Sequence, residues 1–561
     1  MTPETPAGPQ TGAPAPLVLG TQPLTITDVV SVARGRRRVE VAPDVDVRMA
    51  ASLDWLDGVV QGMDTTTPAI YSVNTGFGSL AGRAAFADPD DAAELSWRLL
   101  LSNASGVGRA VEEEVVRATM LIRAASLAQG CSGVRPVLVH TLVAMLNADV
   151  HPRVPEYGSL GASGDLIPLA HIALVMSRPA AGELDPRDSG EAVLDGRVVP
   201  GIEAMAAAGV EHVVLGAKDG LALVNGTSFS CAQLVLALHD AENALASACV
   251  TAAMTMEAVR GFGDALVEDL HRVRGQRGQI EVAATLRTLL EGSALIDGDR
   301  ETDPSRQPPQ DAYSVRCVPQ VFGAVKDALR FVHDIVEREV NAVTDNPLVF
   351  PELPASRRLK ALSGGNFHAE YVALAADVLS IAATEIGSIT ERRLFRLDDG
   401  SLNRGLPDML VASEKVGLDC GYMLPQYLAA ALVSDCKTLA HPDSVDSIPT
   451  CANQEDHVSM ANNAGRHARQ VVSNVETVVG IELLMAAQAL ELRLAVDGLD
   501  SSALGASSRT ALELVRSTRS ADGRPVDHLT RDVVMYPRVR AAVDLVHTGA
   551  LLEALGMTAQ L

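Results

Sequence analysis

The interpretation of this sequence starts from one stretch, Gly158-Ser159-Leu160-Gly161-Ala162-Ser163-Gly164-Asp165-Leu166-Ile167-Pro168-Leu169-Ala170-His171. Its three glycines, two serines and one proline are incompatible with the interior of a regular helix or strand. The apolar residues that follow predict a tight loop leading directly into a helix. The central tripeptide Ala162-Ser163-Gly164 also occurs as Ala104-Ser105-Gly106. The tripeptide alone therefore says little, and its surroundings have to supply its meaning.

The composition favours a mainly α protein. Of the 561 residues, 47% are hydrophobic but only 3% are aromatic, and this mixture suits closely packed helices better than a β-sandwich. The net charge is −24, whereas nucleic-acid binding needs clustered lysine and arginine. We therefore expect no nucleic-acid partner.

The seven cysteines are scattered, and no CxxC pair occurs. This usage is typical of a reduced, cytoplasmic protein in which cysteine acts as a small hydrophobic residue. No run of eighteen apolar residues is present, so we expect no membrane-spanning helix. The first residues also lack the basic-then-apolar pattern of a signal peptide.

The pattern along the chain changes near residue 217. Residues 1–20 form a proline-rich segment that is predicted to be a disordered tail. Residues 179–200 are predicted to be an exposed excursion with short strands. Long helices are expected afterwards, one over 221–256 and another over 485–496. A further helix face is marked by apolar residues at steps of three and four, namely Val321, Val325, Leu329, Val332, Val336, Val340 and Val343.

Four polar clusters interrupt the apolar segments, at 225–227, 310–316, 363–370 and 444–457. Each one taken singly is more readily explained as a helix cap. Together they supply tyrosine, arginine, amide and glutamate side chains at helix starts, which attract anions. Arg316 is suited to bind a carboxylate through two parallel hydrogen bonds.

These segments resemble the histidine ammonia-lyase and phenylalanine ammonia-lyase family, whose members use a methylidene-imidazolone group. The resembling segments span most of the chain in family order and comprise residues 71–78, 158–165, 220–227, 274–280, 310–316, 345–350, 364–370 and 444–457. The second Ala-Ser-Gly copy lies outside them. The remaining alternative to an enzyme is a helical scaffold in which the loop never reacts.

The resemblance implies an elongated central helical bundle with an N-terminal lobe that carries the prosthetic-group loop. The expected divisions are the tail at 1–20, the N-terminal lobe at 21–216, the central bundle at 217–480 and a C-terminal helical part at 481–561. It also implies a homotetramer in which each active site is built from three subunits.

The same resemblance implies that Ala162, Ser163 and Gly164 form 4-methylidene-imidazol-5-one, with no external cofactor and no metal. The glycine nitrogen attacks the alanine carbonyl carbon, and two waters leave. In the family, this electrophile binds the substrate amine, a base removes the β-proton, and ammonia departs to leave an α,β-unsaturated acid.

The remaining site residues are carried over by motif. Tyr71 matches the base, and Tyr313 matches a second catalytic tyrosine. Arg316 matches the clamp for the substrate carboxylate. The other substrate-contacting positions, for polar support and an active-site wall, are Asn225, Gln310 and Phe350. A phenol that acts as a base needs a lowered pKa, and nearby helix N-termini would help.

Three positions concern the choice of substrate. Glu455 lies in Asn453-Gln454-Glu455-Asp456-His457, which follows the histidine-lyase pattern, and its carboxylate suits an imidazole N–H. Asn103 stands where histidine lyases carry histidine, and Ile167 is more typical of the aromatic lyases and aminomutases. The resemblance thus implies a histidine ammonia-lyase that forms urocanate. The alternative is a lyase for tyrosine, phenylalanine or another amino acid, or a 2,3-aminomutase.

Overall fold

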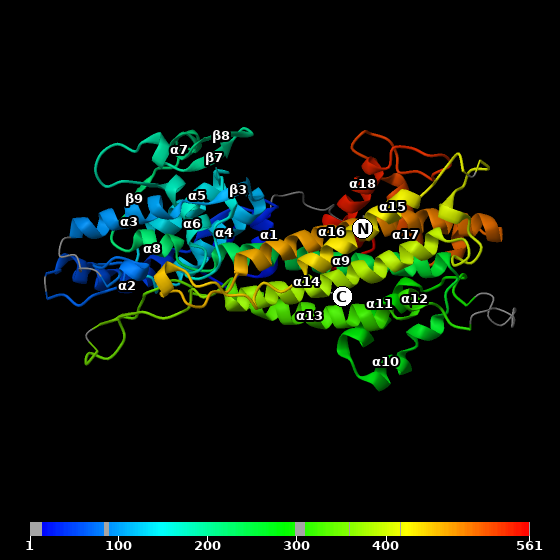
Figure 1. The fold of residues 1–561 in the computed structure, drawn as a ribbon, viewed down its shortest axis with the longest axis horizontal. Helices are drawn as coiled ribbons and strands as arrows, with labels where there is room; N and C mark the ends of the chain where they lie inside the picture. Colours follow the sequence, from blue (N-terminus) through cyan, green and yellow to red (C-terminus); the bar gives the residue numbers. More distant parts are fainter. Residues whose placement is uncertain are drawn as a thin grey trace, which may run out of the picture. The chain divides into compact units, whose positions relative to one another are not determined.

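The computed structural model describes residues 14–64, 66–82, 89–297, 309–357, 359–415 and 417–559. Helices dominate and the strands are short, which confirms the expected mainly α fold (Figure 1). The chain forms two compact units. Unit 1 contains the chain up to Ala232 together with Glu337–Glu370 and Ser447–Asn462, and unit 2 contains Gln233–Val336, Tyr371–Asp446 and Asn463–Leu561.

Unit 1 is a mainly helical lobe that also contains small two- and three-stranded sheets. Its helices are α1 (Ile26–Ala33), α2 (Pro43–Gln61), α3 (Pro89–Asn103), α4 (Glu113–Ala128), α5 (Val137–Asn147), α6 (Leu166–Met176), α7 (Gly201–Ala208) and α8 (Asp219–Val224). Its short 3-10 turns are η1 (Gly78–Leu80), η2 (Pro186–Asp188) and η5 (Cys451–Asn453). Residues 1–13 of the predicted tail lie outside the described residues, and its end forms strand β1 (Leu17–Leu19).

Among the described residues, the strands of unit 1 pair in five small sheets. β1 pairs parallel with β2 (Val39–Val41), and β6 (Ser177–Arg178) pairs parallel with β9 (Val213–Val214). The antiparallel sheets are β3 (Val107–Ala110) with β5 (Pro155–Tyr157), β10 (Leu348–Val349) with β11 (Ala361–Leu362), and the order β4 (His151–Pro152), β7 (Glu191–Leu194), β8 (Arg197–Pro200). β7 and β8 form the short strands expected within 179–200.

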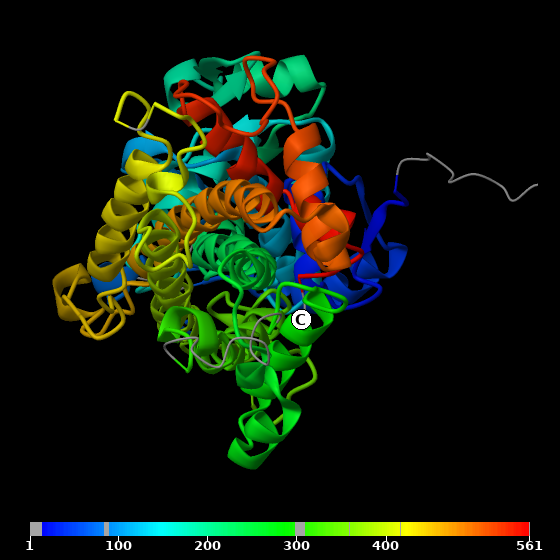
Figure 2. The same ribbon diagram turned by 90° about the vertical axis from the view of Figure 1, so that its right-hand side faces the viewer.

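Unit 2 is built on long helices that run side by side (Figures 1 and 2). Its helices are α9 (Ser228–Ala258), α10 (Glu268–Arg274), α11 (Arg277–Leu289), α12 (Tyr313–Arg316), α13 (Val318–Glu339), α14 (Glu370–Asp398), α15 (Met423–Leu439), α16 (Ala461–Asp497), α17 (Ala506–Ser517), α18 (Tyr536–His547) and α19 (Ala550–Ala554), and α9, α13, α14 and α16 reach into unit 1 at one end. The 3-10 turns here are η3 (Gly263–Leu266), η4 (Asp408–Leu410) and η6 (Ser501–Ala503).

A buried ion pair ties three of these helices together. The guanidinium of Arg393 on α14 donates to Glu482 on α16 from Nε at 2.5 Å and from Nη2 at 2.7 Å. Thr251 and Thr255 on α9 donate their hydroxyls to the same carboxylate, at 2.5 and 3.0 Å. Because each oxygen of Glu482 accepts two hydrogen bonds, its buried charge is well compensated.

Two helix predictions need correction in detail. The segment 221–256 is not one helix, because α8 ends at Val224 and α9 begins at Ser228. Asn225 is extended and Gly226 has φ +134°, so the backbone breaks there. The periodic helix is α13, which ends at Glu339, before the last two apolar residues of the pattern.

One helix among the described residues, α14, is long and apolar enough to cross a membrane by length and composition. Of its most apolar window, 67% is buried inside the protein, as in a core helix of a bundle.

Candidate active site

The loop at 158–165, predicted to carry the prosthetic group, is anchored at its end by Asp165. One carboxylate oxygen accepts hydrogen bonds from the backbone N–H groups of Phe229 and Ser230, at 3.1 and 2.8 Å, in the first turn of α9. The other accepts from the hydroxyl of Ser159 at 2.7 Å. Burial raises the pKa of Asp165, and these hydrogen bonds lower it in part. These hydrogen bonds fix the loop to the N-terminus of α9. A helix N-terminus stabilises a negatively charged group such as the Asp165 carboxylate.

The centre of the loop pairs with the break between α8 and α9. The carbonyl oxygen of Ser163 accepts from Asn225 Nδ2 at 3.1 Å and from the Gly226 N–H at 3.3 Å. Gly164 has φ +71°, and a Cβ atom there would collide with the backbone of Gly226. Only glycine fits this position.

The side chain of Ser163 meets the carboxylate of Glu455. Ser163 Oγ donates to Glu455 Oε1 at 2.8 Å, and Thr450 Oγ1 donates to Oε2 at 2.7 Å. The Thr450 N–H also donates to the carbonyl oxygen of Glu455 at 2.9 Å, which closes the short loop between these residues. The sequence predicted both Ser163 and Glu455 as site residues, and the structure brings them into contact.

Tyr71 lies in a neighbouring loop. Its hydroxyl oxygen accepts from the Gly78 N–H at 2.8 Å, at the start of η1. The loops of Tyr71 and Glu455 are joined where the Ser79 N–H donates to Cys451 Sγ at 3.1 Å.

The pKa of Tyr71 is not lowered as expected. Burial raises the pKa of this phenol, and the negative charge of Glu455 raises it further, whereas the Gly78 N–H lowers it only in part. The Gly78 N–H at the start of η1 thus lowers the pKa of Tyr71 as expected, but within a single chain burial raises the pKa by more.

Asn103 and Phe350 are held by the fold at other points of unit 1. Asn103 is the last residue of α3, and its buried Nδ2 has no hydrogen-bond partner among the described residues. Phe350 directly follows Val349, the last residue of β10. Val349 packs in the same hydrophobic cluster as Ile70 and Val73, which flank Tyr71 in the sequence.

The other three predicted residues lie together in unit 2. Gln310, Tyr313 and Arg316 line a cleft of about 400 Å³ that also contains Arg396 and Arg404. The Arg316 guanidinium lies 4.7 Å from the ring centroid of Tyr313 and donates through Nε to the Asp311 carbonyl at 2.9 Å. Tyr313 is 71% exposed. This cationic cleft suits a carboxylate ligand.

A family model described as aromatic amino acid lyase matches residues 24–517. The chain belongs to the aromatic amino acid lyase family. A histidine ammonia-lyase from Gloeobacter violaceus is 44% identical over 540 residues, which cover 96% of this chain and 97% of the relative.

Solved structures of family members have the same fold. Histidine ammonia-lyase from Trypanosoma cruzi superposes with a TM-score of 0.83 and 34% identity, covering 96% of this chain and 95% of the other. Tyrosine aminomutase from Streptomyces globisporus superposes with a TM-score of 0.86 and 32% identity, covering 97% and 98%. This fold therefore serves both lyases and aminomutases.

Two residues that support the site in this aromatic amino acid lyase family member were not singled out from the sequence. Thr450 orients Glu455, and the fully buried Arg123 donates through Nη1 to the carbonyl oxygen of Asn225 at 2.5 Å. Burial lowers the pKa of Arg123, while the charges of Asp345 and Asp165 raise it. The sequence does contain a signal for Arg123. An arginine within a largely apolar helix is a buried charge, and a buried charge needs a specific partner.

Proposed function

We propose that this chain is a histidine ammonia-lyase, which eliminates ammonia from L-histidine and releases urocanate. One observation carries the choice of substrate, namely the hydrogen bond between the Glu455 carboxylate and Ser163. A carboxylate at that place can accept a hydrogen bond from the substrate's imidazole N–H, which an amide would accept more weakly. The histidine ammonia-lyases among its relatives support the same choice.

The prosthetic group of this proposal is 4-methylidene-imidazol-5-one made from Ala162-Ser163-Gly164, with no external cofactor. The residues present fit it, because Gly164 occupies a position that only glycine can take and Ala162 is buried against Val458 and Met460. The loop thus holds the two backbone groups that must join in a defined place. Once formed, the group supplies an electrophilic methylene carbon that makes the substrate nitrogen a better leaving group.

The chain's own residues then bind and deprotonate the substrate. In this proposal Tyr71 removes the β-proton, assisted by the Gly78 N–H, which stabilises the phenolate form. Arg316 binds the substrate carboxylate, and Tyr313 and Gln310 line the same cleft. Asn225 holds the backbone of Ser163.

The proposed assembly is a homotetramer in the cytoplasm that acts on a small amino-acid substrate. In it, each site is built from three subunits, and Gln310, Tyr313 and Arg316 of one subunit contribute to the site around Ser163 of another. The divisions at residues 20, 216 and 480 belong to the same proposal. Asn103 and Phe350 are proposed to line the substrate pocket.

A 2,3-aminomutase is the second candidate. Asn103, in place of the histidine of histidine lyases, and the fit to tyrosine aminomutase favour it. An aminomutase would return ammonia to the β-carbon of its substrate and so would produce a β-amino acid.

The test is to incubate the purified protein separately with L-histidine, L-tyrosine and L-phenylalanine and to identify the products. Histidine should give urocanate and equimolar ammonia, with little turnover of the aromatic amino acids. If histidine is inert while tyrosine or phenylalanine reacts, the assignment is wrong, and a β-amino acid product would establish the aminomutase instead.

A further inference from the structure

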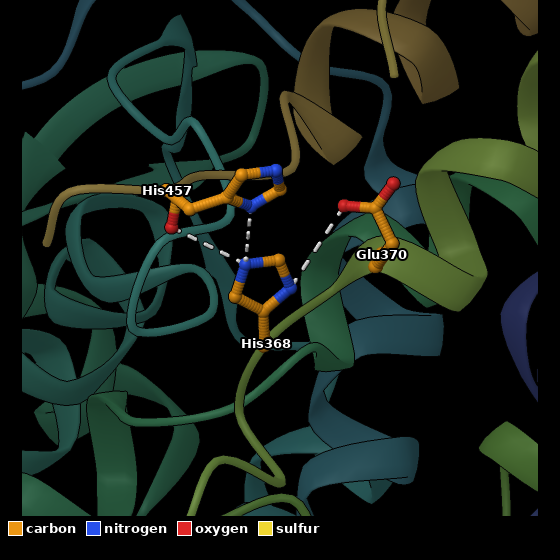
Figure 3. Close-up of side chains that lie close together, drawn as sticks. All are labelled: His368, Glu370 and His457. Carbon is orange, nitrogen blue, oxygen red and sulfur yellow. Dashed lines mark hydrogen bonds and ion pairs between the residues drawn. The ribbon is translucent and has the colours of Figure 1, made fainter. Parts of the chain in front are cut away.

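Three side chains outside the proposed catalytic group lie close together (Figure 3). Glu370 is the first residue of α14, His368 precedes it by two positions, and His457 follows Glu455 by two positions. One ligand atom from each lies within 4.8 Å of the others. Figure 3 shows the His368 ring between the other two side chains.

The two imidazoles are spaced like ligands of one ion. His368 Nε2 and His457 Nδ1 are 3.5 Å apart, which is long for a hydrogen bond between nitrogens. Two nitrogens at about 2.0–2.1 Å from a tetrahedral zinc ion lie about 3.4 Å from each other. The rings are stacked, with centroids 5.5 Å apart, and His368 Nε2 also lies 3.3 Å from the His457 carbonyl oxygen, so binding of one ion by both nitrogens requires the rings to rotate.

Within the part of the chain that the structure describes, one oxygen of the Glu370 carboxylate lacks a hydrogen-bond donor, although the side chain is part-exposed. Its Oε2 atom is buried and has no hydrogen-bond donor among the described residues. The atom lies 4.0 Å from His368 Nδ1, which is too far for a hydrogen bond. A cation beside this oxygen would supply the partner that it lacks.

We propose that His368, Glu370 and His457 bind a transition-metal dication of the zinc class. The imidazoles bind through His368 Nε2 and His457 Nδ1, and a change in the Glu370 side-chain torsions brings its carboxylate to the ion. Two imidazoles and one carboxylate suit zinc-like ions better than Ca²⁺ or Mg²⁺, which prefer oxygen ligands throughout. The part-exposed side chains of His368 and Glu370, 28% and 42%, leave room for a fourth ligand.

The ion would join two segments that both hold the prosthetic-group loop. The Ala369 N–H, between His368 and Glu370, donates to the Gly161 carbonyl at 3.4 Å. Ser459 Oγ, two residues after His457, donates to the same carbonyl at 3.2 Å. Metal binding therefore stabilises the folded arrangement around this loop and raises the melting temperature by mass action. This role does not depend on the proposed substrate.

The test is calorimetric titration of the chelator-treated full-length protein with Zn²⁺. Wild type should bind one ion per chain. His368→Ala and the near-isosteric Glu370→Gln should each weaken zinc binding by about 10- to 100-fold or more. That range is typical when a residue that only supports a metal ligand is changed, and a ligand itself should matter at least as much. The matched control is His547→Ala, since His547 forms a second histidine–carboxylate group among the described residues, with Asp240 and Glu476. It should bind like wild type.

Cobalt substitution of the unaltered protein gives a second readout that needs no variant. Visible bands of low-symmetry nitrogen and oxygen coordination are expected, without the charge-transfer band of a thiolate ligand. Absence of saturable binding, equal binding by all variants, or loss of binding in His547→Ala alone would each overturn the proposal. A thiolate band from the seven cysteines would do so as well.

Discussion

At the scale of single residues, Glu455 connects the chemistry of the loop to the choice of substrate. Its two oxygens accept hydroxyl hydrogen bonds from Ser163 and Thr450, at 2.8 and 2.7 Å. Loss of water from Ser163 would remove the first of these partners. One oxygen of Glu455 would then be left to accept another donor, and the imidazole N–H of histidine is such a donor.

We predict that Glu455→Gln lowers kcat/KM for histidine by about 10- to 100-fold, because a hydrogen bond to a charged group contributes about 1.5–3 kcal/mol. Steady-state kinetics would measure this. The matched control is Asp456→Asn, which changes the adjacent, exposed carboxylate. Equal losses in the two variants would show that Glu455 has no special role.

Tyr71 gives a pH-dependent prediction. Burial raises the pKa of its phenol above the usual value, so the phenol is protonated near neutral pH. If the phenolate is the base, kcat rises with pH through the alkaline range as Tyr71 loses its proton. Tyr71→Phe should lower kcat by about 10²- to 10⁴-fold, the usual contribution of a general base, and remove this rise. A variant that keeps the alkaline rise would assign the base to another group.

At the scale of elements, the loop at 158–165 is held by hydrogen bonds to the start of α9. Asp165 joins them through hydrogen bonds to Ser159, Phe229 and Ser230, and its side chain is fully buried. The backbone N–H groups of Phe229 and Ser230 can only donate, so one side-chain oxygen is required there, whereas the Ser159 hydroxyl on the other oxygen can both donate and accept. The geometry of Ser163 and Gly164 rests on this junction.

We predict that Asp165→Asn destabilises the protein by about 1–3 kcal/mol, since its N–H₂ group would replace the oxygen that accepts from the Ser159 and Ser230 hydroxyls and would break both hydrogen bonds. Thermal melting at fixed protein concentration measures the change, and Asp188→Asn, at an exposed carboxylate, is the control. Unchanged melting in Asp165→Asn would mean that the junction contributes nothing to stability.

The sequence predicted these elements unevenly. Periodic valines and leucines marked α13 because one face of that helix is buried and the pattern is local. The polar residues Asn225 and Gly226 predict a helix start, whereas the structure has a break between two helices there. A short polar cluster is compatible with either, so the sequence pattern does not distinguish them. The contact between Ser163 and Glu455 joins residues that are 292 positions apart, and no local pattern encodes such a pairing. Only the family resemblance pointed to both residues.

At the scale of the whole molecule, the candidate residues fall into two groups. Tyr71, Ser163, Asn225 and Glu455 belong to unit 1, and Gln310, Tyr313 and Arg316 to unit 2. In the proposed homotetramer the second group completes a site on a different subunit, as closed symmetric assemblies permit.

Complementation tests this division. Ser163→Ala and Arg316→Ala should each be nearly inactive alone. Tetramers reassembled from a mixture of the two should regain activity, because some sites then take Ser163 and Arg316 from unaltered segments of different subunits. Mixtures with no more activity than either variant would place both residues of a site on one subunit.

The electrophile is the central claim, and the accurate mass of the intact, purified chain tests it most directly. Formation of the prosthetic group from Ala162-Ser163-Gly164 predicts a mass lower than that of the sequence by two water molecules, with the loss mapped to the peptide that contains Ser163. The Ser163→Ala variant should lack the full loss. An active wild-type protein with the unmodified mass would contradict the account.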